Sequence, residues 1–153
     1  MDYLEEIFSQ QMDLNKRLFL EKRGMDFEKL CSFEFGITDQ EKIKIDWMLK
    51  FSRALIHESI ELEGSLPWKW WKEMSADWQN VHMELIDQLH FWVSMCQIAG
   101  LDPEKIFTLY TKKNKLNHVR QDGGYGGDYK KVDENGVEDN KRIDELIGGK
   151  DAL

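Results

Sequence analysis

Four acidic residues in the middle of the chain form two pairs with the same spacing. Glu58 and Glu61 make the first pair, and Glu84 and Asp87 make the second. Residues three apart on an α-helix lie on one face, about one turn from each other, so each pair would present two carboxylates in the same direction. Two such helices packed face to face would bring four carboxylates together, an arrangement suited to holding a cation.

The apolar pattern around these pairs predicts that the carboxylates point inward. Glu58 falls within a stripe of apolar residues at helical spacing: Met48, Phe51, Leu55 and Leu62. A second stripe extends backwards onto Glu84 and Asp87; its members are Phe91, Met95 and Ile98. Burying unpaired carboxylates is costly unless a cation neutralises them, so we predict a divalent metal site between the helices. The alternative is that the acids are solvated helix faces, as is usual in a chain that is 33% charged.

The chemistry of the ligands favours magnesium, with manganese as the alternative, because hard ions prefer all-oxygen sites. A di-iron bundle would require Glu-x-x-His, which neither pair has. The sequence that starts at His57 resembles the zinc protease motif His-Glu-x-x-His, but Glu61 replaces its second histidine. A zinc protease is therefore excluded.

Composition points to one globular domain that acts on a small, diffusible substrate. The chain has 153 residues, 41% of them hydrophobic, and a net charge of −8. That charge opposes general binding to nucleic acid or to anionic membranes. Cys31 and Cys96 form no Cys-x-x-Cys motif and are predicted to be reduced core thiols. With no signal-peptide pattern and no apolar run of membrane-spanning length, we expect a cytoplasmic protein.

Helical periodicity predicts an all-α fold, a bundle of about five helices with the metal site between the two acidic ones. Helices are expected at about 4–20, 38–63, 77–99 and 103–117, with a turn-rich connector at 24–36 and a short candidate at 141–147. Gln11 and Asn15 share one face of the first helix and, taken alone, are ordinary surface amides. We divide the chain into a catalytic domain at 1–130 and an acidic, partly flexible tail at 131–153.

Two further segments carry residue types that bind nucleotides. The connector Pro67-Trp68-Lys69-Trp70-Trp71-Lys72 combines three tryptophans with two lysines, and its rings either pack on the bundle or stack on a planar ligand. A basic cluster near the end of the fourth helix either complements the helix dipole or meets phosphate: Lys112, Lys113, Lys115 and Arg120.

Taken together, the motifs resemble the dimeric all-α dUTPases, which are related to the MazG-type pyrophosphatases. The motifs occur in this order: Gln11-Met12-Asp13-Leu14-Asn15; Glu58-Ser59-Ile60-Glu61 followed by the tryptophan–lysine connector; Glu84-Leu85-Ile86-Asp87 with Leu89-His90-Phe91; Lys115-Leu116-Asn117; and His118-Val119-Arg120-Gln121-Asp122-Gly123-Gly124-Tyr125. The carboxylate pairs are shared by the whole superfamily, whereas the other motifs are more specific to dUTPases. The chain is short for this family and is similar to phage or bacterial members.

The resemblance implies a magnesium-dependent hydrolase that converts dUTP, and also dUDP, to dUMP and so keeps uracil out of DNA. It implies a homodimer in the cytoplasm of a bacterial or phage-infected cell. Metal ligands would be Glu58, Glu61, Glu84 and Asp87, with Glu58 or Glu61 as the general base. The base and sugar pocket would include Gln11, Asn15, Trp68, His90 and Phe91. Asn117 would bind the 3′-hydroxyl, and the triphosphate would be enclosed by Lys72, Lys115, Arg120 and Tyr125.

Two alternatives stay open at this point. A pyrophosphatase of the same fold could act on dCTP or on a non-standard nucleotide, because the same carboxylates would serve any triphosphate. A non-catalytic helical protein with a binding or regulatory role would use its acids only structurally. Substrate profiling distinguishes the first alternative from a dUTPase. Metal-dependent release of pyrophosphate distinguishes an enzyme from the second alternative.

Overall fold

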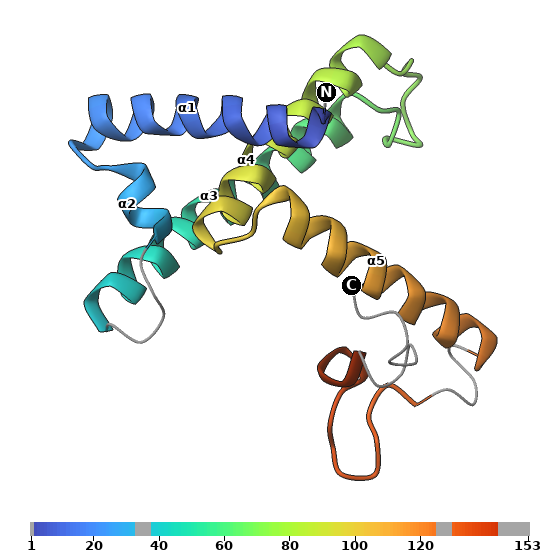
Figure 1. Ribbon diagram of the computed structural model, residues 1–153. Helices are drawn as coiled ribbons and strands as arrows, with labels where there is room; N and C mark the ends of the chain where they lie inside the picture. Colours follow the sequence, from blue (N-terminus) through green and yellow to red (C-terminus); the bar gives the residue numbers. More distant parts are fainter. Residues whose placement is uncertain (1, 33–37, 125–129, 144–153) are drawn as a thin grey trace. The chain divides into compact units, whose positions relative to one another are not determined.

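The computed structural model describes residues 2–32, 38–124 and 130–143. The chain forms two compact units, Met1–Asp102 and Pro103–Leu153. The first contains helices α1 (Tyr3–Arg23), α2 (Phe27–Ser32), α3 (Thr38–Gly64) and α4 (Trp78–Ile98), and the second contains α5 (Pro103–Asp122) and the 3-10 helix η1 (Asp139–Arg142) (Figure 1). The all-α prediction is confirmed: in the described ranges, β-pairing is limited to one isolated bridge between Val132 and Glu138.

Local chemistry sets the ends of the long helices. The Asp2 carboxylate accepts a hydrogen bond from the backbone N–H of Leu4 at 2.9 Å and so caps the start of α1. Gly24 ends that helix with φ +62°, a left-handed conformation that glycine adopts without a steric penalty. Asp77 caps α4 by accepting from the N–H of Asn80 at 3.1 Å. Pro103 opens α5, where its missing N–H costs no intrahelical bond.

Helix α2 lies inside the segment that periodicity predicted to be a turn-rich connector. It is six residues long, too short for a periodic pattern to stand out. Phe27 and Leu30, one turn apart, are almost completely buried, so tertiary packing stabilises this helix. Asp26 supports its first turn by accepting from the N–H of Lys29 at 3.0 Å.

The hydrophobic core of the first unit lies where α1, α2, α3 and the end of α4 meet. Its buried members are Phe19, Phe27, Leu30 and Ile98. The Phe19 ring packs edge-on against Phe27, with centroids 4.7 Å apart, and also contacts Trp47 at 4.3 Å. These contacts anchor α1 on α2 and on the acidic helix α3.

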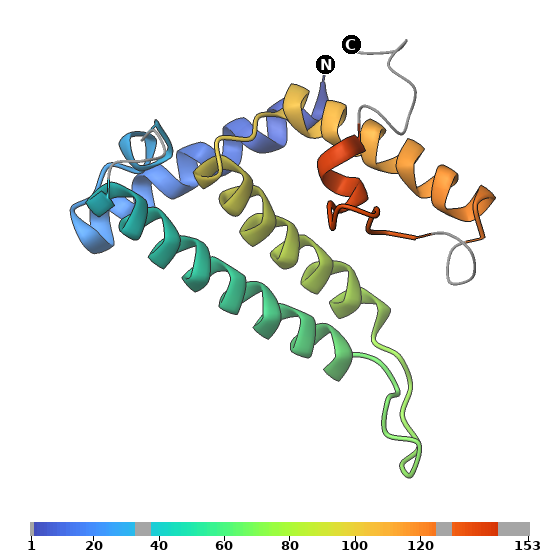
Figure 2. The same cartoon turned by 90° about the horizontal axis from the view of Figure 1, so that it is seen from below.

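Helices α3 and α4 lie side by side and antiparallel, joined by the loop at 65–77 (Figure 2). The N–H of Asp77 donates to the carbonyl of Ser65 at 2.9 Å, which closes the loop where the two helices connect. The second acidic pair is therefore folded back onto the first. In the ranges that the structure describes, no helix is long and apolar enough to cross a membrane.

In the second unit, part of the predicted tail packs on α5. The Arg120 guanidinium on α5 and the Asp139 carboxylate on η1 form a bidentate ion pair, with Nη2–Oδ1 at 2.7 Å and Nε–Oδ2 at 2.9 Å. Both side chains are buried. The division of the chain at residue 130 stays a prediction. Of the helical candidate at 141–147, residues 144–147 lie outside the described ranges.

Candidate functional site

Three of the four predicted metal ligands meet between α3 and α4. Glu58 on α3 and both Glu84 and Asp87 on α4 each offer one carboxylate oxygen, and these oxygens all lie within 4.8 Å of one another. Glu61 is exposed and is not part of this group. The i, i+3 spacing places the acids of each pair on one face, as predicted, but α4 faces Glu58 more directly than it faces Glu61.

Glu84 has the surroundings expected of a cation ligand. Its side chain is 7% exposed, and its Oε1 accepts a hydrogen bond from Asn80 Nδ2 at 3.0 Å. Its other oxygen, Oε2, is buried and has no hydrogen-bond partner among the described residues. A buried carboxylate oxygen without a donor is costly, so the donor set of this site fits a bound divalent ion.

The electrostatics of Glu58 point the same way. Partial burial raises the pKa of the Glu58 carboxyl above its ordinary value, and the negative charges of Glu61, Asp87 and Glu84 raise it further. Crowding of like charges therefore destabilises the fully ionised group of acids. A divalent cation would remove that repulsion.

A pocket of about 370 Å³ connects these acids with the predicted base-binding residues. Glu58 and Asp87 line it together with Gln11, Asn15, His90, Phe91 and Ser94, and its apolar walls come from Leu14, Leu18 and Phe51. Its size falls in the range of small-molecule sites. The helices α1, α3 and α4 thus bring carboxylates, an aromatic ring and amides into one cavity.

Gln11 and Asn15 are buried, at 6% and 2% exposure, rather than lying on the surface as ordinary amides. Their side chains hydrogen-bond to each other and to Ser94 on α4. His90, by contrast with these two buried amides, is exposed to solvent. Within the pocket, His90 is thus the polar base-binding candidate most accessible to a ligand.

The tryptophan–lysine connector follows α3 and is mostly solvent-facing. Trp70 is 90% exposed, and Trp71 packs edge-on against both Trp68 and Trp70. Lys69 lies over the Trp68 ring, 5.1 Å from its centroid. Trp68 and Lys72 are not among the residues that line the pocket described above, so their proposed contacts with substrate stay predictions.

The remaining predicted ligands lie in the second unit. Lys115, Asn117 and Arg120 are on α5, and Tyr125 lies outside the described residues. Arg120 is 8% exposed; besides its ion pair with Asp139, it donates to Asn117 Oδ1 at 3.1 Å. The guanidinium predicted to bind phosphate is therefore bound to a carboxylate in this structure.

Sequence reasoning missed four polar residues with structural roles at these sites: Asn80, Ser94, Gln97 and Asp139. The signal for two of them was present, because Ser94 and Gln97 follow His90 at the helical spacings of four and seven residues. A polar line along an otherwise apolar helix marks a buried network. Asp139 carried no such signal, because its partner is nineteen residues away in the chain.

The all-helical fold and the meeting of Glu58 with Glu84 and Asp87 across two antiparallel helices fit the class of all-α nucleotide pyrophosphatases. The sequence profile of a family described as dUTPase matches residues 3–97, and the chain belongs to this family. The matched segment contains both acidic pairs and the whole pocket, and it lies within the first unit.

Two phage proteins are similar to this chain. It is 41% identical over 140 residues to a dCTP pyrophosphatase of Enterobacteria phage T4, covering 75% of this chain and 81% of that protein. It is 37% identical over 78 residues to a dCTP pyrophosphatase of Enterobacteria phage LZ5, covering 42% of this chain and 45% of that protein. No solved structure matches the chain.

Proposed function

We propose that this protein hydrolyses pyrimidine deoxynucleoside triphosphates, both dUTP and dCTP, to the monophosphate and pyrophosphate. The observation that carries the proposal is that carboxylates and base-binding candidates line the same pocket. The family description supports dUTP, and the phage relatives support dCTP. Because these relatives come from phages, we place the reaction in the cytoplasm of an infected bacterial cell.

In this proposal Glu58, Glu84 and Asp87 hold a magnesium ion, with Glu61 beside them. A bound divalent ion would neutralise phosphate oxygens and lower the pKa of a coordinated water. Glu58 or Glu61 accepts the proton of the attacking water while the anhydride bond to the leaving pyrophosphate breaks.

The other walls of the pocket position the nucleotide. Phe91 provides an aromatic surface for the base, and His90 provides a polar contact at its edge. Lys72, Lys115 and Tyr125 are assigned to the phosphates and Asn117 to the 3′-hydroxyl, as the family resemblance implies. The same resemblance assigns Arg120 to the phosphates, whose oxygens would compete with the Asp139 carboxylate and the Asn117 side-chain oxygen that accept from the guanidinium in this structure.

Pyrophosphate release from dUTP, dCTP, dTTP and dATP, with and without magnesium, tests this function. We expect kcat/KM for dUTP and dCTP to lie within about tenfold of each other and at least about tenfold above dTTP, whose methyl group would meet the aromatic wall. Activity should disappear when magnesium is removed. A preference for dATP, or pyrophosphate release that persists in a chelator, would contradict the proposal.

We also propose that the protein is a homodimer. Apolar side chains at helical spacing line one exposed stripe of α3: Ile45, Leu49, Ile56 and Ile60, each at least 50% exposed. An apolar stripe along a helix of this length is unusual on a monomer and is typical of an interface between subunits.

Sedimentation analysis tests the dimer. We expect the mass of two chains at micromolar concentration, and we expect Ile56→Glu combined with Ile60→Glu to shift the protein towards the monomer. Glu63→Gln, an exposed change near the end of the same helix, is the control and should leave the mass unchanged. A monomeric wild-type protein with full activity would overturn the assignment.

A further inference from the structure

Five polar side chains form a continuous hydrogen-bond network between α1 and α4. The members are Gln11, Asn15, His90, Ser94 and Gln97. All except His90 are no more than 6% exposed, so water does not compete for their hydrogen bonds. In such a network the direction of each bond is decided by the groups at its ends.

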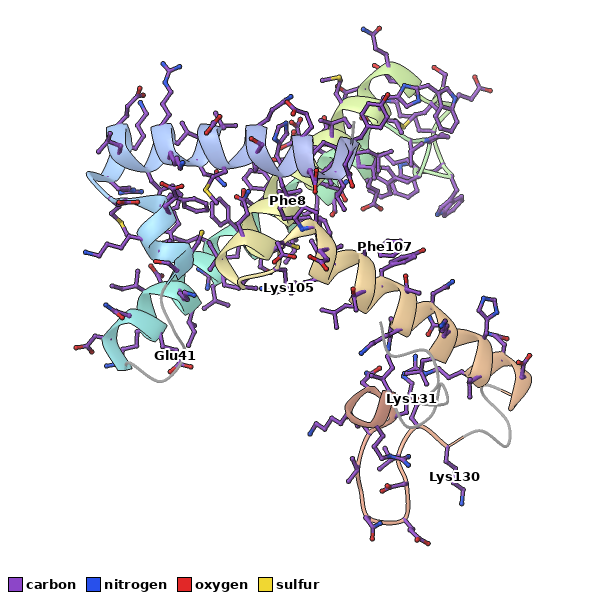
Figure 3. The ribbon with its side chains drawn as sticks, in the orientation of Figure 1. Phe8, Glu41, Lys105, Phe107, Lys130 and Lys131 are labelled. Carbon is purple, nitrogen blue, oxygen red and sulfur yellow. The ribbon has the colours of Figure 1, made fainter. Side chains whose placement is uncertain are left out.

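One end is the backbone carbonyl of Phe8, a buried residue labelled on α1 in Figure 3. A carbonyl only accepts, so the Gln97 group bonded to it at 2.8 Å must be the Nε2 amide nitrogen. The Gln97 Oε1 atom then faces Asn15 and accepts from its Nδ2 at 3.3 Å. The orientation of the Asn15 amide follows from a backbone carbonyl on α1.

A second backbone carbonyl imposes the same orientation. The Ser94 hydroxyl donates its proton to the carbonyl of His90 at 2.8 Å. Its oxygen is therefore an acceptor towards both amides, taking Asn15 Nδ2 at 2.9 Å and Gln11 Nε2 at 3.1 Å. The backbone carbonyls of Phe8 and His90 therefore independently require the same orientation of the side-chain amides.

The orientation is passed on to His90. Gln11 Nε2 donates to Asn15 Oδ1 at 3.1 Å as well as to Ser94, so the Gln11 carbonyl oxygen is the atom that faces the imidazole. Gln11 Oε1 lies 2.5 Å from His90 Nδ1. Because Oε1 only accepts, Nδ1 carries the proton, and in the neutral ring Nε2 keeps its lone pair.

We propose that Ser94 and Gln97 are positioning residues that hold His90 in its Nδ1–H form, so that the base pocket presents a hydrogen-bond acceptor at Nε2. The ligand class is then a pyrimidine that carries an N–H donor on the edge formed by positions 3 and 4. Cytosine has the amino group at position 4, and uracil has the N–H at position 3. The inference rests on the proposed function, and it explains how one site takes both bases.

The tautomer is measured on the metal-free protein without any substrate. At about pH 8.5, where an ordinary imidazole is neutral, nitrogen-15 shifts of the ring distinguish a protonated Nδ1 from a protonated Nε2. The His90 signals are assigned by their loss in His90→Gln. We expect protonated Nδ1 in the wild type, and a mixture or protonated Nε2 when Ser94→Ala and Gln97→Met are combined, because the Gln11 amide is then able to flip.

A matched variant separates positioning from packing. Ile98→Val removes a methyl group next to Gln97 in the core and lowers stability without touching the network. It should leave the His90 tautomer unchanged, whereas the double variant should not. A wild-type ring protonated at Nε2, or a double variant that keeps Nδ1–H, would overturn the proposal.

Substrate selectivity provides the second measurement. The triphosphate of 2-pyrimidinone deoxyriboside has an acceptor at position 3 and no donor at position 4. We expect the kcat/KM of the wild type for this analogue to be at least about tenfold lower than for dCTP and dUTP. The double variant should lose most of that discrimination. Equal use by the wild type would overturn the inference. If none of the triphosphates were hydrolysed, the proposed function would fail, while the tautomer measurement would still decide the role of Ser94 and Gln97.

Discussion

Replacing Glu58 with glutamine is expected to lower kcat for pyrophosphate release about a thousandfold, because a lost metal ligand removes several kcal/mol of charge stabilisation. Glu58 supplies one of the three carboxylate oxygens that lie within 4.8 Å of one another, so Glu58→Gln removes one of the three negative charges assigned to the metal. The measurement is kcat with dUTP and with dCTP at saturating magnesium. Glu61→Gln, Glu84→Gln and Asp87→Asn should change activity in the same direction.

The same substitution is expected to raise the melting temperature of the metal-free protein at neutral pH. The pKa of Glu58 is raised in the folded state, so the folded protein binds this proton more tightly than the unfolded chain does. The resulting stability is fully present below the ordinary glutamate pKa and is lost as the pH rises through the raised pKa. Glutamine carries no charge for the neighbouring carboxylates to repel. The gain in melting temperature of Glu58→Gln over the wild type should therefore be largest at neutral pH and should vanish in acid.

Glu63→Gln is the matched control for both measurements, since Glu63 is an exposed glutamate near the end of the same helix. It should retain activity and should show no pH-dependent gain in stability. A Glu58→Gln protein that melts well below the wild type without metal would contradict the metal-site assignment. The carboxylate would then be a partner in a structural ion pair rather than a source of repulsion.

Replacing Asp139 with asparagine is expected to destabilise the second unit by about 3–5 kcal/mol, because it leaves a buried guanidinium without its counter-charge. Asp139 is 1% exposed and binds Arg120 through both of its oxygens. The change keeps the size of the side chain and removes its charge. Hydrogen exchange of the α5 amides measures the effect within this unit, and we expect their protection to fall.

Two further variants make the test specific. Glu134→Gln removes an exposed acid of the same unit and should leave α5 protection unchanged. Arg120→Met combined with Asp139→Leu removes both charges and should cost less than Asp139→Asn alone, because no unpaired charge stays buried. Unchanged protection in Asp139→Asn would show that the ion pair contributes little to this unit.

The four long helices and the spacing of the two acidic pairs could be predicted from the sequence, because both depend on residues close together in the chain. Capping residues such as Asp2 and Asp77 and the 3.6-residue apolar period are local signals. The spacing of Glu84 and Asp87 likewise specifies a shared face before any packing is known. Family resemblance then added the residues expected around a nucleotide.

The way in which distant helices combine these local features depends on tertiary packing. This packing selected Glu58, rather than Glu61, to meet Glu84 and Asp87, because contact across α3 and α4 depends on how the two helices pack. It stabilised α2 through the burial of Phe27 and Leu30, and it paired Arg120 with Asp139. The direction of the network that ends at His90 depends on the Phe8 carbonyl on another helix, because a buried amide is oriented by its partners and not by its neighbours in sequence.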